Sequence, residues 1–386
     1  MSSRRRRILG VALGAAVLLL GFLLYRDGRH GRRVSAHRMT NHDVDFDFGA
    51  PPCSPAPRPG NELRVAYLGV GGLLVEWRGS VLVAAPYFTR QGLIETIFGA
   101  LRVDSEAIAR GLAPLDAARW DVVLSGHSHY DHLADLPEVM TRHAPAARLW
   151  TNASGARMLA PFPALTSRIH AVEPSLGSWV RPLRDGVPLP FRFMPLPSDH
   201  APHLYGLRYA HGTVEESWDT WDGKTVRSML DGLTVNFLID LLDGEEIAFR
   251  MFYQGSASPS GVGHPPTDEI ERRGVDLAIL CAPPYWQVED YPEGVLAATR
   301  AGYVLAIHYE DFLQPADRPL RFVRSLTDTR VDRLLERIEG AIPERGAVVP
   351  ATPVCGPSAE RWSMPLPGEW LGFDLPNDAV LTSSTP

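Results

Sequence analysis

Lysine is almost absent from this chain of 386 residues, and cysteine is scarce. Lys224 is the single lysine, so arginine supplies the other 37 of the 38 basic residues. Guanidinium groups suit phosphate recognition, but a codon preference for arginine is the simpler explanation. The three cysteines, Cys53, Cys281 and Cys355, are too few for a disulfide scaffold and lack metal-binding spacing. Cys53 and Cys355 could still form one bridge in an oxidising compartment.

Net positive charge is confined to the amino terminus of the chain. Residues 1–38 contain nine arginines and one acidic residue, Asp27. These residues carry +8 and the whole chain carries −7, so the remainder carries −15. An acidic body gives no reason to expect nucleic acid as a partner. With 45% hydrophobic and 22% charged residues, the composition is that of a globular protein able to bury a core.

Charged residues are missing from residues 8–25, ILGVALGAAVLLLGFLLY. As a helix at about 1.5 Å per residue, this run would span about 27 Å, close to the hydrocarbon thickness of a bilayer. The alternative is a cleaved signal peptide, which has a shorter apolar region and a small-residue cleavage site. Here the run is longer and is followed by Arg26-Asp-Gly-Arg. We therefore expect residues 1–25 to form a basic N-terminus and a single-pass transmembrane anchor.

The distribution of positive charge gives little indication of the orientation of this anchor. Four arginines precede the apolar run and five follow it closely, so the two flanks nearly balance. Arg5-Arg-Arg-Ile-Leu loosely resembles a twin-arginine export signal, and an ordinary basic flank is the alternative. We expect the body to lie on the non-cytoplasmic side of the membrane. Residues 26–60 are rich in arginine and proline, which predicts an extended linker between membrane and body.

Residues 61–350 have the pattern of one strand-rich α/β domain, and residues 351–386 are a C-terminal tail that packs on it or trails it. Asp243-Gly244 between two apolar runs predicts a hairpin. Segment 211–232 interrupts the strand pattern and is either a lid over a site or a surface loop. Helices are expected near 92–110, 293–301 and 328–340, and strands over 63–69, 73–77, 81–85, 122–124, 234–242, 247–254, 275–281, 303–307 and 347–349.

Four potential metal ligands lie within six residues, directly after the apolar run Val122–Leu124. In extended chain, residues two apart point the same way, so the first two histidines can hold one cation together. The later two side chains lie where the chain is expected to turn into a helix, and they can reach a second cation. Imidazoles with one carboxylate suit zinc, and iron or manganese can be held by similar sets. The four predicted ligands are His127, His129, Asp131 and His132.

The sequence His-x-His-x-Asp-His after a strand resembles the signature of the metallo-β-lactamase superfamily. The variant HYDHL most resembles the branch with N-acyl-phosphatidylethanolamine-hydrolysing phospholipase D and the ascorbate-phosphate lactonase. The resemblance covers roughly residues 62–312 and implies an αββα sandwich with metals at one edge of the sheets. It implies His200, in Pro197-Ser-Asp-His, as the third ligand of the first metal, with His203 as the fallback. It implies His308 as the last ligand of the second metal.

Two acidic positions of the superfamily pattern are neutral in this chain. Ser256 stands where the resemblance implies an aspartate that bridges both metals. Ala85, before Pro86, stands where the superfamily pattern has the aspartate of an Asp-Pro element. Two dications with Asp131 and one hydroxide would keep a charge of about +2, so their mutual repulsion is poorly offset. We therefore expect one tightly bound zinc and a second metal that is weakly bound or absent.

Other carboxylates could replace the missing bridge. Asp199, beside the predicted third ligand, is the first candidate, and Glu310 and Asp311 are the next. For each of these acids the alternative is an ordinary solvated loop residue.

The resemblance implies a membrane-anchored, metal-dependent hydrolase in which a metal-bound hydroxide attacks the substrate and Asp131 orients the attacking water. A phosphodiester or phospholipid-like substrate is the first expectation. A lactone or carboxylic ester is the second. The third is a degenerate member that binds metal without turnover, marked by Ser256 and Ala85. The expected partners are a small-molecule or lipid substrate and the membrane, and the sequence does not set the oligomeric state.

Overall fold

The computed structural model describes residues 63–203, 206–314, 323, 331–343 and 361–373. The predicted anchor at 8–25, the linker at 26–60, the strand at 347–349 and the Cys53–Cys355 pair lie outside these residues. Within them, Cys281 is a buried free thiol. No helix in the described part of the chain is long and apolar enough to cross a bilayer.

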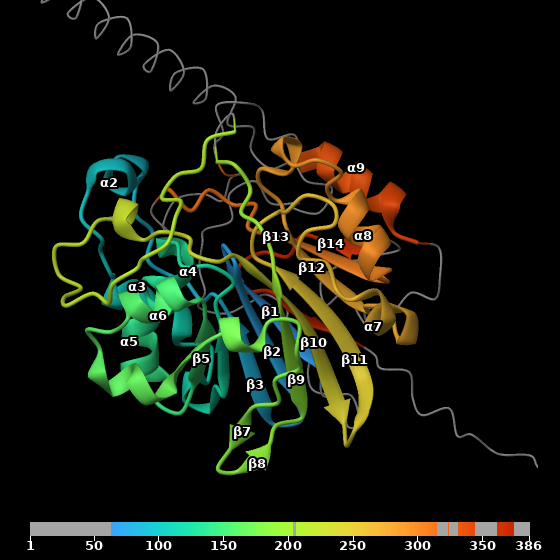
Figure 1. The fold of residues 1–386 in the computed structure, drawn as a ribbon, viewed down its shortest axis with the longest axis horizontal. Coiled ribbons are helices and arrows are strands. Elements are labelled where there is room, and N and C mark those ends of the chain that lie inside the picture. The colour runs from blue at the N-terminus through green and yellow to red at the C-terminus, as the bar shows by residue number, and fades with distance from the viewer. Residues whose placement is uncertain (1–62, 204–205, 315–322, 324–330, 344–360, 374–386) are drawn as a thin grey trace, which may run out of the picture.

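Two large β-sheets form the centre of the body (Figure 1). The seven-stranded sheet has the order β15-β1-β2-β3-β4-β5-β6, and the six-stranded sheet has the order β14-β13-β12-β11-β10-β9. A two-stranded ribbon, β7-β8, stands apart. The strands are β1 (Arg64–Gly69), β2 (Gly72–Trp77), β3 (Ser80–Ala84), β4 (Val122–Leu124), β5 (Arg148–Thr151), β6 (Ile169–Ala171), β7 (Leu183–Arg184), β8 (Val187–Pro188), β9 (Phe191–Pro197), β10 (Val235–Asp243), β11 (Glu246–Gln254), β12 (Leu277–Cys281), β13 (Tyr303–Ile307), β14 (Trp362–Ser363) and β15 (Trp370–Gly372).

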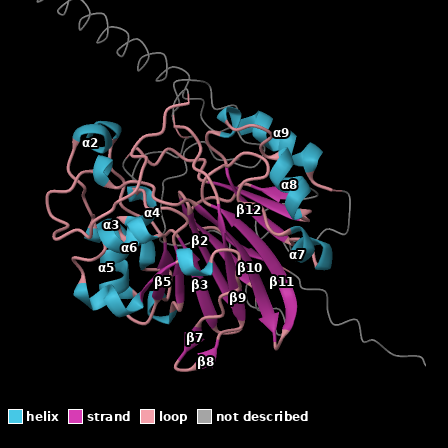
Figure 2. Cartoon of the chain, viewed as in Figure 1, coloured by secondary structure: helices cyan, strands magenta, loops and turns pink. Residues whose placement is uncertain are grey.

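Helices cover the outer faces of both sheets, so the layers follow the αββα order that the resemblance implied (Figures 1 and 2). On the seven-stranded side lie α2 (Leu93–Phe98), α3 (Ser105–Leu112), α4 (Tyr130–Leu133), α5 (Leu136–Glu138) and α6 (Ala153–Met158), and on the other side lie α7 (Thr267–Arg272), α8 (Glu293–Thr299) and α9 (Val331–Ala341). Short helical turns are η1 (Ala117–Arg119), η2 (Val139–His143), η3 (Pro163–Arg168), η4 (Glu173–Ser175), η5 (Val226–Ser228) and η6 (Tyr285–Gln287).

The hydrophobic core has two parts that match these layers. One part joins the facing sheets and continues under α8 and α9, with Tyr67 and Phe237 among its fully buried side chains. The other lies between the seven-stranded sheet and its helices and includes Ile108 and Leu149. Burial of this much apolar surface fixes the two sheets against each other, which places the ends of their strands along one shared edge.

Several predicted elements are confirmed and one is wrong. The hairpin forms as β10 and β11, with Gly244 in the turn at a positive φ of 61°. The single helix expected near 92–110 is instead two helices, α2 and α3. A side chain at Gly99 would meet the carbonyl oxygen of Glu95, and Asp104 caps a new helix by accepting from the backbone of Glu106. Within the predicted tail, β14 and β15 each add an edge strand to one sheet.

Candidate metal centre

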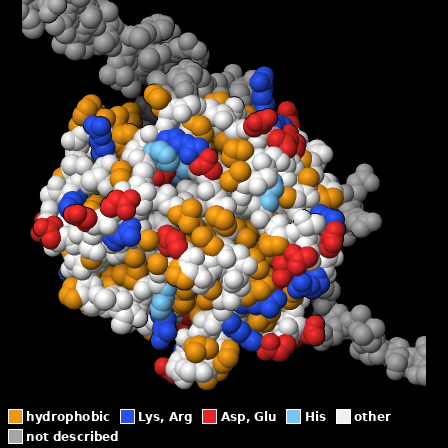
Figure 3. Space-filling view, viewed as in Figure 1, with side chains coloured by type: hydrophobic (Ala, Val, Ile, Leu, Met, Phe, Trp, Pro, Cys, Tyr) orange, Lys and Arg blue, Asp and Glu red, His pale blue; other side chains and the backbone are white. Residues whose placement is uncertain are grey.

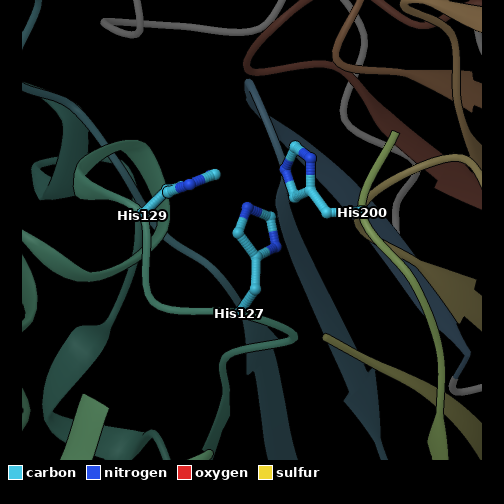
Figure 4. Close-up of side chains that lie close together, drawn as sticks. All are labelled: His127, His129 and His200. Carbon is cyan, nitrogen blue, oxygen red and sulfur yellow. The ribbon is translucent and has the colours of Figure 1, made fainter. Parts of the chain in front are cut away.

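Three histidine rings converge at the edge where strands of both sheets end (Figure 4). His127 and His129 follow β4, and His200 follows β9. Their ring centroids lie 4.6–4.8 Å apart in all three pairs. Their candidate ligand nitrogens lie within 4.8 Å of one another. Two ligands at about 2 Å from one ion are separated by less than about 4 Å, so these donors need only a small approach to bind one cation together.

The ring nitrogens have the hydrogen-bond pattern that suits a metal. His129 Nε2 lies 3.2 Å from the carbonyl oxygen of Ala210, and His200 Nδ1 lies 2.7 Å from that of Ala201. Because a carbonyl only accepts, each of these nitrogens carries the hydrogen and the opposite nitrogen keeps a free lone pair. His127 Nδ1 is buried without a hydrogen-bond partner. Buried polar atoms are rarely left unpaired, so the residues fit a bound cation.

A second group of ligand atoms adjoins the first. The carboxylate of Asp131 and the ring of His132 lie with His127 within the same 4.8 Å limit. His308 completes the surroundings, because its Nε2 lies 3.3 Å from Asp131 Oδ2, and His132 Nε2 lies 3.6 Å from the same oxygen. Both ring nitrogens of His132 and Nδ1 of His308 are buried without hydrogen-bond partners. The structure thus brings together all six ligands that were predicted from the sequence.

Burial keeps the imidazoles of His127, His132 and His200 neutral, which is the state that binds metal. Burial lowers the pKa of His127 and of His200 well below the ordinary histidine range, and neighbouring imidazoles add to the effect. Burial also lowers the pKa of His132 to about 3, against the opposing charge of Asp131. For Asp131, burial alone would raise the pKa, but the adjacent His132 and His308 hold it below the usual aspartate value. A charged carboxylate therefore lies beside the neutral ring of His132.

Ser256 and His203 lie beside the first group. The Ser256 hydroxyl is buried and accepts a hydrogen bond of 3.1 Å from the backbone of Ala201, next to His200. The His203 ring stacks on His200 at 4.8 Å, and its Nδ1 accepts from the backbone of Tyr209 at 3.0 Å. Since Nδ1 of this neutral ring already accepts, Nε2 carries the hydrogen, and His203 is less suited to bind metal than His200.

The acids considered as replacements for a bridging aspartate have other partners. Both Asp199 oxygens pair with the guanidinium of Arg208. Burial raises the pKa of Asp199, but Arg208, the backbone of His200 and the charge of His211 bring it below the usual value. Asp311 accepts from the backbone of Leu313. Neither acid belongs to a group of candidate metal ligands among the described residues.

Glu310 supports a ligand instead of binding metal in this arrangement. Its buried carboxylate accepts from the Tyr67 hydroxyl and from the backbone of Val70. The same hydroxyl accepts from the backbone N–H of His308 at 2.9 Å. This contact holds His308 at a φ of +62°, a left-handed conformation that is rare for a residue with a side chain. Nothing in the sequence pattern identified Tyr67 as part of the site, because it reads as an ordinary strand residue.

Gly71 is a further site residue that sequence reasoning missed. A Cβ at this position would lie 2.4 Å from Cε1 of His132, so only glycine lets the β1–β2 turn approach that ring. The run Gly69-Val-Gly-Gly72 was the available signal, since clustered glycines often mark a close approach.

Segment 211–232 is tied directly to the loop of the histidine cluster. The backbone N–H of Ser128, between His127 and His129, donates to the carbonyl of Asp231 at 3.0 Å. Asp231 is almost fully buried, and its carboxylate lies 2.8 Å from Nδ1 of His211. The segment therefore forms a wall of the site. Within residues 211–232, η5 is the only regular element.

Comparison with known proteins gives matches in structure alone. No family model matches the chain, and no curated protein matches it in sequence. Among solved structures, Igni18, a metallo hydrolase from the archaeon Ignicoccus hospitalis, is 17% identical with a TM-score of 0.44, over 81% of this chain and 99% of that one. The metallo-β-lactamase fold protein YhfI from Bacillus subtilis is 15% identical with a TM-score of 0.37, over 64% of this chain and 86% of that one.

A third structure has a different described activity. CmlA, a diiron β-hydroxylase from Streptomyces venezuelae, is 13% identical with a TM-score of 0.43, over 74% of this chain and 52% of that one. At identities and scores this low, neither the activity nor the metal of these proteins transfers to the chain. The chemistry must come from its own side chains.

Proposed function

We propose that this protein is a metal-dependent hydrolase. The observation that carries the proposal is the convergence of His127, His129 and His200, whose ligand atoms lie within 4.8 Å of one another, beside the second group around Asp131. Nδ1 of His127, both ring nitrogens of His132 and Nδ1 of His308 are buried without hydrogen-bond partners, which is costly unless a cation satisfies the site. A divalent cation bound here supplies Lewis acidity and makes water nucleophilic at neutral pH.

The chain's own residues supply the remaining tasks. Asp131, ionised and 3.3 Å from His308, can accept a hydrogen bond from the attacking water and orient it toward the substrate. The neighbouring imidazoles of His132 and His308 hold that carboxylate in place. The neutral ring of His203 presents an N–H at the site and can donate to a substrate oxygen.

Zinc is the metal that we propose, because the donor set consists of imidazoles and one carboxylate; iron and manganese remain alternatives. One ion would be held by His127, His129 and His200. A second ion near Asp131, His132 and His308 would bind weakly, because the two groups contain one carboxylate among the described residues. The alternative function of the same site is that of a degenerate member that binds metal without turnover.

The substrate that we propose is a phosphodiester or a phospholipid-like ester. The support is the sequence resemblance described above and the apolar run at residues 8–25, which would hold the body beside lipid. A lactone or carboxylic ester is the alternative substrate for the same site. We further propose that this run is a single-pass anchor with the body on the non-cytoplasmic side, a proposal that membrane fractionation and protease protection of tagged protein would test.

The function is tested with the purified full chain, loaded with zinc, on bis-p-nitrophenyl phosphate and on a simple lactone. We expect metal-dependent turnover of the phosphodiester and its loss in His129→Ala. Turnover of the lactone alone would select the alternative substrate class. Bound zinc without turnover of either compound would instead support the degenerate interpretation.

A further inference from the structure

An Asp–His pair lies beside the candidate metal centre and has no part in the function proposed so far. Nδ1 of His211 lies 2.8 Å from Oδ2 of Asp231. The Asp231 side chain is 2% exposed, whereas that of His211 is 52% exposed. The other carboxylate oxygen of Asp231 accepts from the backbone of Gly212 at 2.9 Å. A fixed, buried carboxylate thus holds a ring whose outer edge meets solvent.

The pair is connected to two of the predicted ligands. The residue before His211 is Ala210, whose carbonyl oxygen accepts from His129 Nε2 at 3.2 Å and from the backbone of Asp231 at 3.0 Å. The carbonyl oxygen of Asp231 accepts from the backbone N–H of Ser128, between His127 and His129, at 3.0 Å. His211 therefore lies on the wall that spans the first group of ligands. On the face shown in Figure 3, one group of histidine side chains lies beside basic and acidic side chains.

The backbone around His211 is held in an uncommon conformation. Ala210 has a φ of +50°, which costs a residue with a side chain about 1 kcal/mol, and Gly212 has a φ of +131°. The hydrogen bonds of Asp231 to both residues maintain this turn. Because Nδ1 faces Asp231, Nε2 lies on the opposite edge of the ring and is directed away from the buried carboxylate.

We propose that His211, oriented by Asp231, is the general acid that protonates the leaving oxygen during hydrolysis; the inference rests on the function proposed above. The attacking water forms a bond to phosphorus or to the carbonyl carbon and releases one proton to solvent. The bond from that centre to the leaving oxygen breaks, and its electron pair stays on the oxygen. That oxygen takes the proton from Nε2, and the neutral ring regains a proton from solvent. One water is consumed and no other reactant is needed.

The test compares two leaving groups on the same centre. We use methyl phosphodiesters of p-nitrophenol and of ethanol, or the corresponding esters if the wild type cleaves esters. Nitrophenolate leaves without help, whereas ethoxide needs a proton. His211→Gln should therefore lower kcat/KM for the ethyl substrate by about 100-fold or more and for the nitrophenyl substrate by less than about threefold. Asp231→Asn should show the same selectivity.

The matched control is His143→Gln. His143 ends η2 and has no side-chain hydrogen bond or ion pair in the described part of the chain. It should leave both rates unchanged. Equal losses on the two substrates in His211→Gln, no loss on either, or a wild type that cleaves only the nitrophenyl substrate would each overturn the assignment. A metal-loaded wild type that cleaves neither would mean that the hydrolase proposal itself has failed, and the general acid with it.

A second readout needs neither metal nor turnover. In proton NMR of the metal-free full chain, the Nδ1–H of His211 bonded to the Asp231 carboxylate should give a downfield signal. We expect that signal to be absent from His211→Gln and Asp231→Asn and present in His143→Gln. Its persistence in His211→Gln would show that the pair does not exist as described.

Discussion

Ser256 is the residue at which this chain departs most clearly from the pattern that it resembles. Its buried hydroxyl accepts from the backbone of Ala201 at 3.1 Å, so it lies against the loop that carries His200. A neutral hydroxyl cannot offset the repulsion between two dications as a carboxylate does. The structure provides no substitute in Asp199, whose oxygens pair with Arg208.

An aspartate at position 256 should therefore raise the affinity of the site for the second metal ion. We expect Ser256→Asp to bind close to two zinc ions per chain, whereas the wild type retains close to one after dialysis. Elemental analysis and isothermal titration measure both values. Ser256→Asn, similar in size but neutral, is the control and should behave like the wild type. A wild type that already retains two ions would contradict our account of the site.

At the scale of elements, the packing of a helix can require a glycine at one position. Gly111 lies in α3, and a Cβ at this position would lie 2.2 Å from the ring of Phe88, which is buried. Gly340 lies in α9, and a Cβ there would meet nothing within 4 Å. The same substitution should thus have opposite effects in the two helices.

Gly111→Ala should lower the free energy of unfolding by about 1–3 kcal/mol, because the well-packed contact with Phe88 must open. Gly340→Ala should raise it by about 0.5–1 kcal/mol, because alanine restricts the unfolded chain and favours helix. Urea denaturation of the purified chain measures both. Changes of the same sign would show that α3 or α9 is packed differently from this structure.

Elements also show what local sequence can and cannot specify. The hairpin β10–β11 was predictable, because Asp243-Gly244 and the flanking apolar runs act between near neighbours. The break between α2 and α3 was not, although Gly99 and Asp104 are visible in the sequence, because apolar residues continue on both sides. Strands β14 and β15 have two and three residues and become strands only by pairing with β13 and β1. Their formation depends on sheets that already exist.

For the whole molecule, the buried imidazoles link stability to pH. Burial lowers the pKa of His127, His132 and His200 in the folded protein, to about 3 for His132, whereas an unfolded histidine titrates near about 6.5. At a pH below this unfolded pKa, the unfolded chain binds protons at these histidines and the folded chain does not, so protonation favours unfolding. Asp135 acts in the opposite direction, because burial raises its pKa to about 6. Burial raises the pKa of Asp276 as well, so three imidazoles act against two carboxyls.

The metal-free protein should therefore lose stability as the pH falls from about 6.5 toward 3. We expect a lower free energy of unfolding at pH 4.5 than at pH 7 in the presence of a chelator, measured by urea denaturation. The decline should be shallower in His132→Gln, which removes one of the groups responsible. A free energy of unfolding that stays constant or rises over this range would show that the rings are not buried as the structure has them.

Sequence alone determined the parts of this protein that depend on near neighbours. Four of the predicted ligands lie within six residues after a strand, and their types and spacing predict a metal site without any knowledge of the fold. The assignments of His200 and His308 needed the resemblance, because 68 and 176 residues separate them from His132 and no local pattern spans such distances.

Only the tertiary structure decided which distant groups meet at the site. Packing of the two sheets brings His200 and His308 to the edge where His127 lies, and it gives Asp199 an arginine partner that the sequence did not suggest. It also places Tyr67 beneath His308 and Asp231 beside His211. These contacts arise because the hydrophobic effect, which is non-local and non-directional, buries the sheet faces against each other. This burial fixes the relative positions of strand ends that are far apart in the chain. Side chains at those ends become neighbours only as a result.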